Sequence, residues 1–129
     1  MMDMPKVGEF CWNELATNDV NAAKDFYGNL LGWTFSEHKT DDSIYTMIKH
    51  KDGEFGGMWQ IPNEQKNQIP PHWMGYILVD DIESTLNNAT KLGATVKMPV
   101  TQVGEMGRFI VIADPTGAHI AFWQTLNQK

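Results

Sequence analysis

This 129-residue chain contains two segments that share the same order and spacing of residue types, although few residues are identical. The first copy reads ELATNDVNAAKDFYGNLLGWTF, residues 14–35, and the second reads YILVDDIESTLNNATKLGATV, residues 76–96. In each copy a short apolar strand leads to an Asp, a helix-like stretch, a Leu-Gly pair and another strand. The shared order and spacing favour duplication over coincidence. We therefore expect two copies of one module within a single domain.

Each copy carries signals for both ends of its helix. Asp19 and Asp81 are predicted N-caps, because a carboxylate there accepts hydrogen bonds from free backbone N–H groups. Gly32 and Gly93 suit the left-handed position that ends a helix. Between these signals, apolar residues fall on one helical face, which we expect to pack on a sheet. They are Val20, Ala23, Phe26, Tyr27, Leu30 and Leu31 in the first copy, and Ile82, Leu86, Ala89 and Leu92 in the second.

The remaining segments alternate as strands do and are separated by turn residues, such as Asp52-Gly53. The predicted strands cover residues 10–16, 33–38, 44–49, 54–60, 73–79, 94–98, 109–113 and 118–126. The order predicts an α+β fold in which two βαβββ modules form a curled mixed sheet around a cleft, with the helices outside. Module one is expected at about 8–61, a Pro-containing linker at 62–72 and module two at about 73–126.

Composition narrows the classes of function. The net charge is −6 and the 10 Lys and Arg residues are scattered, which argues against a basic face for nucleic acid. No apolar stretch approaches the ~20 residues of a membrane helix. The single cysteine, Cys11, leaves no intrachain disulfide and is typical of a reducing compartment. We therefore expect a cytoplasmic protein with no nucleic-acid or membrane partner.

Several motifs resemble those of one known family. They are Asp19, Phe26-Tyr27 and Leu31-Gly32-Trp33 in the first copy, and Val79-Asp80-Asp81, Leu92-Gly93-Ala94 and DPTGAHIAFWQ (114–124) in the second. With FCWNEL and GEMGRF they are similar to the glyoxalase/bleomycin resistance/dioxygenase (vicinal oxygen chelate) superfamily, closest to its bacterial "predicted enzyme related to lactoylglutathione lyase" group. The resemblance covers nearly the whole chain. It implies this fold, a small organic ligand and a homodimer, and it leaves the reaction open.

The resemblance also implies where a divalent metal would bind. Metal-dependent members place His, Gln or Glu seven residues before each helix-capping Asp, which here gives Trp12 and Met74. A third ligand lies four residues after the Gly of DPxG, which gives Ala121. The fourth position lies within GEFGGMWQ and is not placed to the residue, with Glu54 and Gln60 as flanking donors. Indole, thioether and methyl groups are poor ligands for hard divalent ions, so we expect no cofactor.

A displaced metal site is the alternative. Side chains alternate across a strand, so Glu14 shares a face with Trp12, His72 with Met74, and His119 with Ala121. Two His and one Glu form a suitable ligand set, although their spacing differs from that of the family. The stronger interpretation has no metal: His72, at the linker end, is solvent-exposed, and His119 hydrogen-bonds a neighbour.

Without a metal, the inward-facing residues predict a mostly aromatic cleft, which is typical of sites for small organic ligands. Glu14 and His119 are the candidate catalytic pair, because each can tune the pKa of the other; a structural pairing is the alternative. Arg108 ends a Gly-rich segment, 104–108, that either covers the cleft or is a plain hairpin loop. The candidate ligand-binding residues are Trp12, Trp59, Met74, Tyr76, Arg108 and Trp123, with Trp59 and Phe122 of undecided facing.

Three functions remain open. The first is a glyoxalase-like enzyme or binding protein for an unassigned small molecule, without the usual metal site and with lyase-type chemistry as one option. The second is a non-catalytic protein that sequesters an aromatic or planar compound, as bleomycin-resistance proteins do. A metal-dependent lyase or dioxygenase with displaced ligands is a further alternative, and a structural module with a filled core is the plainest one.

Overall fold

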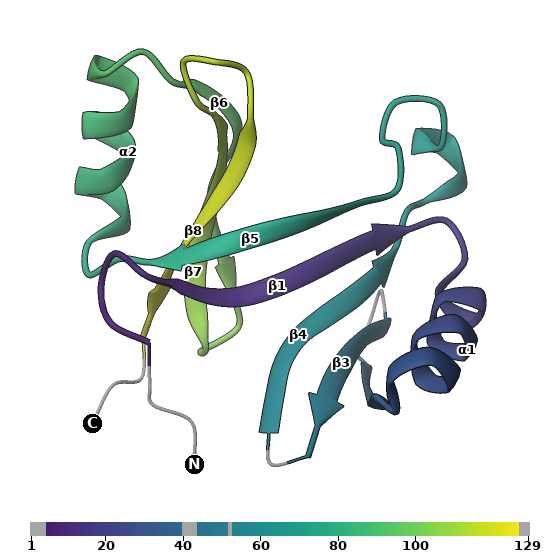
Figure 1. Cartoon of the computed structure of the whole chain (residues 1–129). Coiled ribbons are helices and arrows are strands. Elements are labelled where there is room, and N and C mark those ends of the chain that lie inside the picture. Colours follow the sequence, from purple (N-terminus) through teal and green to yellow (C-terminus); the bar gives the residue numbers. More distant parts are fainter. Residues whose placement is uncertain (1–4, 40–43, 52, 127–129) are drawn as a thin grey trace. The chain divides into compact units, whose positions relative to one another are not determined.

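The computed structural model describes residues 5–39, 44–51 and 53–126, and its elements follow the βαβββ order twice (Figure 1). The predicted order is confirmed. A short 3-10 helix, η1 (Asn63–Gln65), lies within the predicted linker. The first module contains β1 (Phe10–Thr17), α1 (Val20–Leu31), β2 (Thr34–Lys39), β3 (Ile44–His50) and β4 (Gly53–Gln60); the second contains β5 (His72–Leu78), α2 (Ile82–Lys91), β6 (Thr95–Val103), β7 (Gly107–Ala113) and β8 (His119–Thr125).

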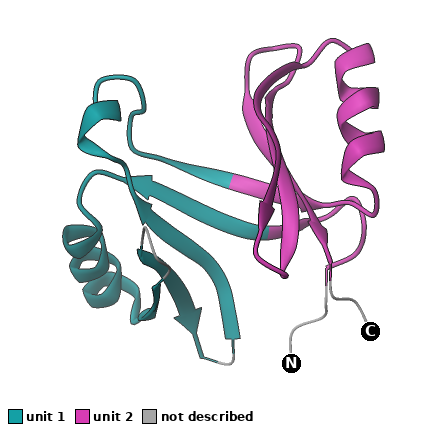
Figure 2. Cartoon of the chain, turned by 180° about the vertical axis from the view of Figure 1, so that it is seen from behind, with its two compact units in different colours: residues 1, 12–74 teal, residues 2–11, 75–129 magenta. Residues whose placement is uncertain are grey.

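The chain divides into two compact units (Figure 2). Unit 1 contains Trp12–Met74, and unit 2 contains residues 5–11 and 75–126 of the described chain, so β1 and β5 each run from one unit into the other. Unit 1 has the strand order β2-β3-β4-β1 and unit 2 the order β5-β8-β7-β6. The β1–β4 and β5–β8 pairs are parallel and the hairpin pairs are antiparallel. The predicted α+β class, a mixed sheet of eight strands with two helices, is confirmed.

The core of each unit lies between its helix and one face of its strands. In unit 1, Leu15, Ile48 and Met58 form the buried cluster, and Tyr27 of α1 packs against it. In unit 2, Ile110 and Ile112 of β7 pack with Ile82 at the start of α2. Because side chains alternate across a strand, the residues between these core positions face away from the helix.

Both predicted helix caps are confirmed. Asp19 Oδ1 accepts a hydrogen bond from the Ala22 N–H at 3.0 Å, and Asp81 Oδ1 accepts one from the Ser84 N–H at 3.1 Å. Gly32 has φ +77° and directly caps α1. Gly93 has φ +106° and follows the α2 cap residue, Leu92. Among the described residues, neither helix is long and apolar enough to cross a membrane.

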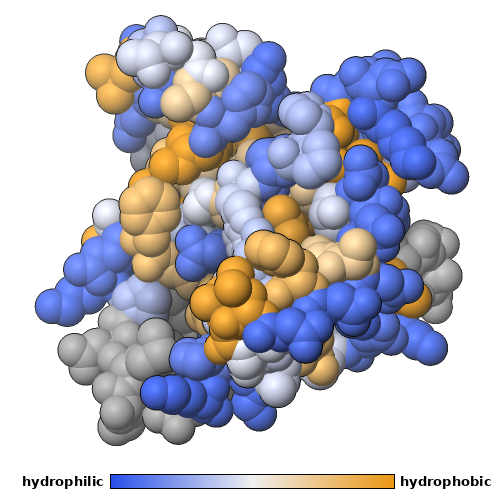
Figure 3. Space-filling view, turned by 45° about the vertical axis from the view of Figure 1, so that its right-hand side comes forward, coloured by the Kyte–Doolittle hydropathy of each residue, from blue (hydrophilic) through white to orange (hydrophobic). Residues whose placement is uncertain are grey.

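The prediction that Phe26, Leu30 and Leu31 pack on the sheet is wrong. Phe26 is 59% exposed and Leu30 is 62% exposed, and Leu92 of the second copy is exposed as well. Tyr27 stacks on Trp33 with ring centroids 5.2 Å apart, and both rings pack against the core of unit 1. Phe26, Leu30 and Leu31 lie outside this core. The face drawn in Figure 3 shows that apolar groups reach the surface of this chain.

Strand limits differ most at β6. The prediction ended this strand at residue 98, but it continues to Val103 along β7, with register shifts on either side of Met98. β7 likewise begins at Gly107, so the turn between the two strands is shorter than the predicted 104–108 segment. Asp52 of the predicted Asp52-Gly53 turn lies outside the described residues.

Candidate functional site

The face of unit 1 that points away from α1 carries a row of polar and aromatic groups. Leu15 of β1 is in the core. Because side chains alternate along a strand, Trp12 and Glu14, at odd separations from Leu15, lie on the opposite face. Glu14 pairs with Gly57 of the parallel strand β4. On β3 the buried Thr46 and Ile48 face α1, which places Tyr45 on the same face as Glu14.

Trp12, Tyr45 and Glu14 are joined by two hydrogen bonds. The indole Nε1 of Trp12 donates to the Tyr45 hydroxyl at 3.0 Å, and this hydroxyl donates to Glu14 Oε2 at 2.7 Å. The second distance is that of a well-formed O–H···O hydrogen bond. All three side chains are half-buried, so the bonds are partly shielded from water.

Gly57 makes room for this arrangement. A Cβ atom at residue 57 would overlap the hydroxyl and ring carbons of Tyr45. The phenol ring therefore lies directly against the backbone of β4, beside the strand that carries Glu14. Any side chain at residue 57 would displace the ring.

The surroundings of Tyr45 keep it in the neutral form. Burial raises the pKa of the Tyr45 phenol strongly, and the negative charge and hydrogen bond of Glu14 raise it further, whereas the bond from Trp12 lowers it. The Tyr45 hydroxyl therefore keeps its proton at physiological pH and donates a hydrogen bond to the Glu14 carboxylate. A carboxylate held in this way is suited to accept a hydrogen bond or a proton from a bound molecule.

Tyr45 belongs to the candidate site, and the sequence analysis did not single it out. The signal lies in the repeat. A Trp-Gln pair lies at or next to the end of the last strand of both modules, and in each case the Gln oxygen accepts a hydrogen bond from the first N–H of the helix. Gln60 Oε1 binds the Val20 N–H at 3.1 Å, and Gln124 Oε1 binds the Ile82 N–H at 2.8 Å.

The Trp-Gln pairs align the two modules residue by residue. They match Trp59 with Trp123 and therefore Gly57 with Ala121, the position predicted for a metal ligand in module two. The strand registers agree, because Gly57 pairs with Glu14, two residues after Trp12, and Ala121 pairs with Tyr76, two residues after Met74. The fourth metal-ligand position is therefore Gly57, and neither Glu54 nor Gln60 occupies it.

The residues at the four family positions do not fit a divalent ion. Trp12, Gly57, Met74 and Ala121 provide an indole N–H already donated to Tyr45, no side chain, a thioether and a methyl group. Within residues 5–39, 44–51 and 53–126, no three His, Cys, Asp or Glu side chains are grouped as a metal site would require.

The three candidates for a displaced metal site, Glu14, His72 and His119, have different contacts. His72 Nδ1 lies 2.7 Å from the Pro70 carbonyl oxygen and donates a hydrogen bond to it when Nδ1 carries the proton. His119, at the start of β8, is exposed and pairs with Ala113 of β7. Glu14 belongs to unit 1 and His119 to unit 2, so their action as a catalytic pair stays a prediction.

The corresponding face of unit 2 is aromatic. Tyr76 of β5 is buried, and its ring meets that of Phe109 edge-on with centroids 6.1 Å apart. The Trp123 ring lies against Gly107, and its Nε1 donates to Thr125 Oγ1 at 3.0 Å. Trp59 of unit 1, half-buried on β4, pairs with Ala16 and so shares the face of Glu14. Phe122, by contrast, packs in the core of unit 2.

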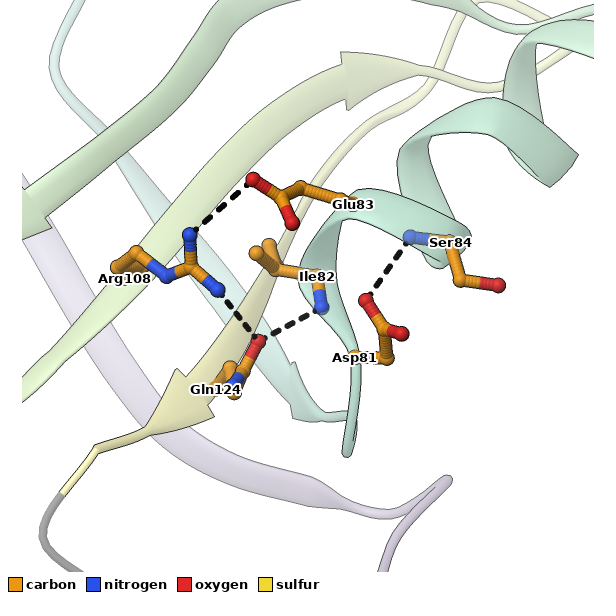
Figure 4. A network of polar contacts seen from close by, with 6 residues as sticks. All are labelled: Asp81, Ile82, Glu83, Ser84, Arg108 and Gln124. Carbon is orange, nitrogen blue, oxygen red and sulfur yellow. Dashed lines mark hydrogen bonds and ion pairs between the residues drawn. The ribbon is translucent and has the colours of Figure 1, made fainter.

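Arg108 lies in β7, and its side chain reaches the start of α2 (Figure 4). Its guanidinium donates to Gln124 Oε1 and to Glu83 Oε2, each at 3.3 Å. Gln124 Oε1 also accepts the Ile82 N–H, so Arg108 joins a network around the first turn of the helix. A ligand-binding role for Arg108, predicted from a loop position, stays a prediction, and the loop itself is shorter than expected.

A comparison with protein families agrees with this fold. The model of the "Glyoxalase/Bleomycin resistance protein/Dioxygenase superfamily" matches residues 9–122. The chain belongs to this superfamily. The resemblance stated from the motifs is thereby confirmed at the level of the superfamily.

Curated relatives within the glyoxalase superfamily are longer than this chain. "Putative glyoxylase CFP32" of Mycobacterium tuberculosis (strain CDC 1551 / Oshkosh) is 33% identical over 128 residues, which cover 94% of this chain and 49% of that protein. "Anthracycline biosynthesis protein DnrV" of Streptomyces peucetius is 28% identical over 130 residues, covering 91% of this chain and 47% of that protein. The chain thus spans about half the length of these relatives.

Solved structures share the glyoxalase-superfamily fold at low identity. Methylmalonyl-CoA epimerase from Mycobacterium tuberculosis has a TM-score of 0.67 at 14% identity, over 98% of this chain and 94% of that one. A hypothetical protein from Bacillus halodurans C-125 has a TM-score of 0.71 at 10% identity, over 94% of this chain and 96% of that one. At these identities the likeness establishes the fold and leaves the activity open.

Proposed function

We propose that this glyoxalase-superfamily chain binds a small planar organic molecule on the face of unit 1 that carries Trp12, Tyr45 and Glu14, and does so without the metal of its relatives. The hydrogen-bonded series of indole, phenol and carboxylate carries the proposal. Aromatic side chains supply a flat apolar surface, and one oriented carboxylate supplies the polar contact that fixes a ligand.

Glu14 has the chemical role in this proposal. Its carboxylate accepts a hydrogen bond from a ligand hydroxyl or, where the ligand holds an acidic proton, acts as the general base. His119, in module two, is the predicted second group for proton transfer, in addition to Glu14. A glyoxalase-like isomerisation or lyase step would require such a base, whereas simple binding requires only the acceptor.

The test uses the indole N–H signals of the five tryptophans in ¹H–¹⁵N spectra. We expect β-naphthol, a planar phenol, to shift the Trp12 signal in a saturable manner. Trp33 is the internal control, because it packs against Tyr27 on the side of unit 1 that α1 covers. If saturating β-naphthol and larger planar compounds such as doxorubicin all left the Trp12 signal in place, the proposal would be wrong.

A matched pair of substitutions isolates the carboxylate. Glu14→Gln should weaken β-naphthol binding by about tenfold, the scale of one hydrogen bond to a charged group. Glu37→Gln is the control, because Glu37 lies in the same unit but is paired with Lys24 of α1 at 3.3 Å. Equal effects of the two substitutions would remove Glu14 from the proposed site.

Sequestration without turnover is the second candidate. The name of the DnrV relative refers to anthracycline biosynthesis, and anthracyclines are planar polycyclic compounds that aromatic side chains can stack against. Incubating the chain with each ligand that binds, followed by mass spectrometry of the ligand, separates the two candidates. An unchanged ligand favours sequestration, and a product that Glu14→Gln abolishes favours an enzyme.

A further inference from the structure

We propose that Tyr45 is the positioning residue of this site: its phenol, seated on Gly57 and held by Trp12, fixes the orientation of the Glu14 carboxylate toward the ligand. This inference rests on the proposed function and assigns Tyr45 its role within that site. Tyr45 acts through Glu14 and needs no contact with the ligand itself.

The internal repeat supplies the first argument. The alignment that matches Gly57 with Ala121 also matches Tyr45 with Phe109, because Met47 pairs with Gly57 exactly as Val111 pairs with Ala121. Likewise, Glu14 corresponds to Tyr76 in the first strand of module two. The same two positions therefore hold a phenol and a carboxylate in unit 1, and two packed aromatic rings in unit 2.

The aromatic pair of unit 2 shows a different arrangement at these positions. Tyr76 and Phe109 meet there edge-on. A carboxylate in a half-buried position costs more free energy than an aromatic ring does. In unit 1 this cost is met by a phenol donor at 2.7 Å, and such a polar pair in place of a packed one is typical of a functional site.

The seat of the phenol is equally specific. Gly57 has no side chain, and the space of a Cβ is filled by Tyr45. The Trp12 indole donates to the phenol oxygen, so the phenol proton is directed to Glu14. One partner on each side thus removes the rotational freedom of the hydroxyl, which is how a positioning residue pre-organises the group beside it.

Tyr45→Phe is the natural test, because it installs the residue that module two already has at the equivalent position. The control is Tyr27→Phe: Tyr27 accepts a bond from the Trp73 indole at 3.2 Å in the same unit, on the side covered by α1. The ligands are β-naphthol and its methyl ether, which differ only in the hydroxyl hydrogen that Glu14 would accept.

We expect Tyr45→Phe to weaken β-naphthol binding by about tenfold, on the scale of one charge-assisted hydrogen bond, and to leave binding of the ether unchanged. The double variant with Glu14→Gln should bind β-naphthol no more weakly than Glu14→Gln alone, because Tyr45 acts only through that carboxylate. Tyr27→Phe should change neither affinity.

The possible failures are distinct. If the wild-type chain binds neither these two ligands nor the larger planar compounds named above, the proposed function fails. If it binds β-naphthol and Glu14→Gln weakens this binding while Tyr45→Phe does not, the positioning role alone is wrong. Additive effects in the double variant, or an equal loss for the ether, would likewise show that Tyr45 does not act through Glu14.

Discussion

At the scale of single residues, burial and a neighbouring charge shift the pKa of the Tyr45 phenol in the same direction. Burial and the adjacent Glu14 both raise its pKa above the ordinary tyrosine value of about 10. Above that pH an unfolded chain ionises this phenol and the folded chain does not, so folding stability falls as the pH rises. Below that pH the group has no such effect.

Tyr45→Phe should therefore flatten the alkaline side of the stability curve. We expect the wild-type chain to lose up to about 1.4 kcal/mol more per pH unit than the variant above about pH 10. Urea unfolding at a series of pH values measures the difference, with Tyr27→Phe as the reference. Identical slopes for the wild-type chain and Tyr45→Phe would mean that the phenol is not protected as described.

Asp114 provides the opposite case at acid pH. Its Oδ1 accepts bonds from the Thr116 hydroxyl at 2.7 Å, the Thr116 N–H at 2.8 Å and the Ala118 N–H at 3.1 Å. These bonds, the Thr116 hydroxyl first, lower the pKa of Asp114. Because the ionised form is favoured on folding, this contribution to stability is present above the ordinary aspartate pKa of about 3.9 and is lost as the pH falls below it.

Asp114→Ala should consequently be less stable than the wild-type chain at neutral pH, and the gap should narrow on acidification. Thermal unfolding followed by circular dichroism from neutral to acid pH gives the comparison. Asp25→Ala, which removes an exposed carboxylate on α1, is the control variant. A gap that stays constant would assign the effect of Asp114 to turn geometry alone.

At the scale of elements, the contact between β3 and β4 in unit 1 depends on a missing side chain. Gly57→Ala adds a methyl group where the Tyr45 ring lies. We expect a loss of about 1–3 kcal/mol in the free energy of unfolding, the usual cost of overpacking, together with a shift of the Trp12 indole signal as the phenol moves. Gly53→Ala in the same strand is the control, because nothing lies within 4 Å of an added Cβ there. Equal losses for the two variants would contradict this account.

The helices show which element features a sequence can predict. Asp19, Asp81, Gly32 and Gly93 act within one turn of chain, so their local chemistry was enough to place both helix ends. The exposure of Phe26 could not be predicted in this way, because tertiary packing decides which apolar residues of α1 contact the core. Tyr27 packs there against Trp33, and Phe26 does not. Tyr45 was missed for the same reason: its role depends on the register of three strands, which no single segment encodes.

At the scale of the whole molecule, duplication made the fold predictable and the site only partly so. A repeat of strand, cap, helix and stop predicted the βαβββ order of both modules, whereas η1 in the linker was not predicted. The repeat also shows where the modules diverge, because the positions of Glu14 and Tyr45 hold Tyr76 and Phe109 in the second copy. The hydrogen-bonded pair in unit 1, at positions where unit 2 has packed rings, is therefore the difference between the modules that bears on the proposed site.

The same comparison leads to a prediction about metals for the entire chain. Trp12, Gly57, Met74 and Ala121 stand at the four family positions and offer no suitable ligand for a hard divalent ion. We expect protein purified without chelators to contain less than one equivalent of any transition metal by elemental analysis, and its affinity for β-naphthol to be unchanged after dialysis against EDTA. Zn²⁺ or Mn²⁺ added back is the control and should change nothing. Binding that is lost with EDTA and restored by one of these ions would instead require a displaced ligand set, and substitution of Glu14, His72 and His119 in turn would identify it.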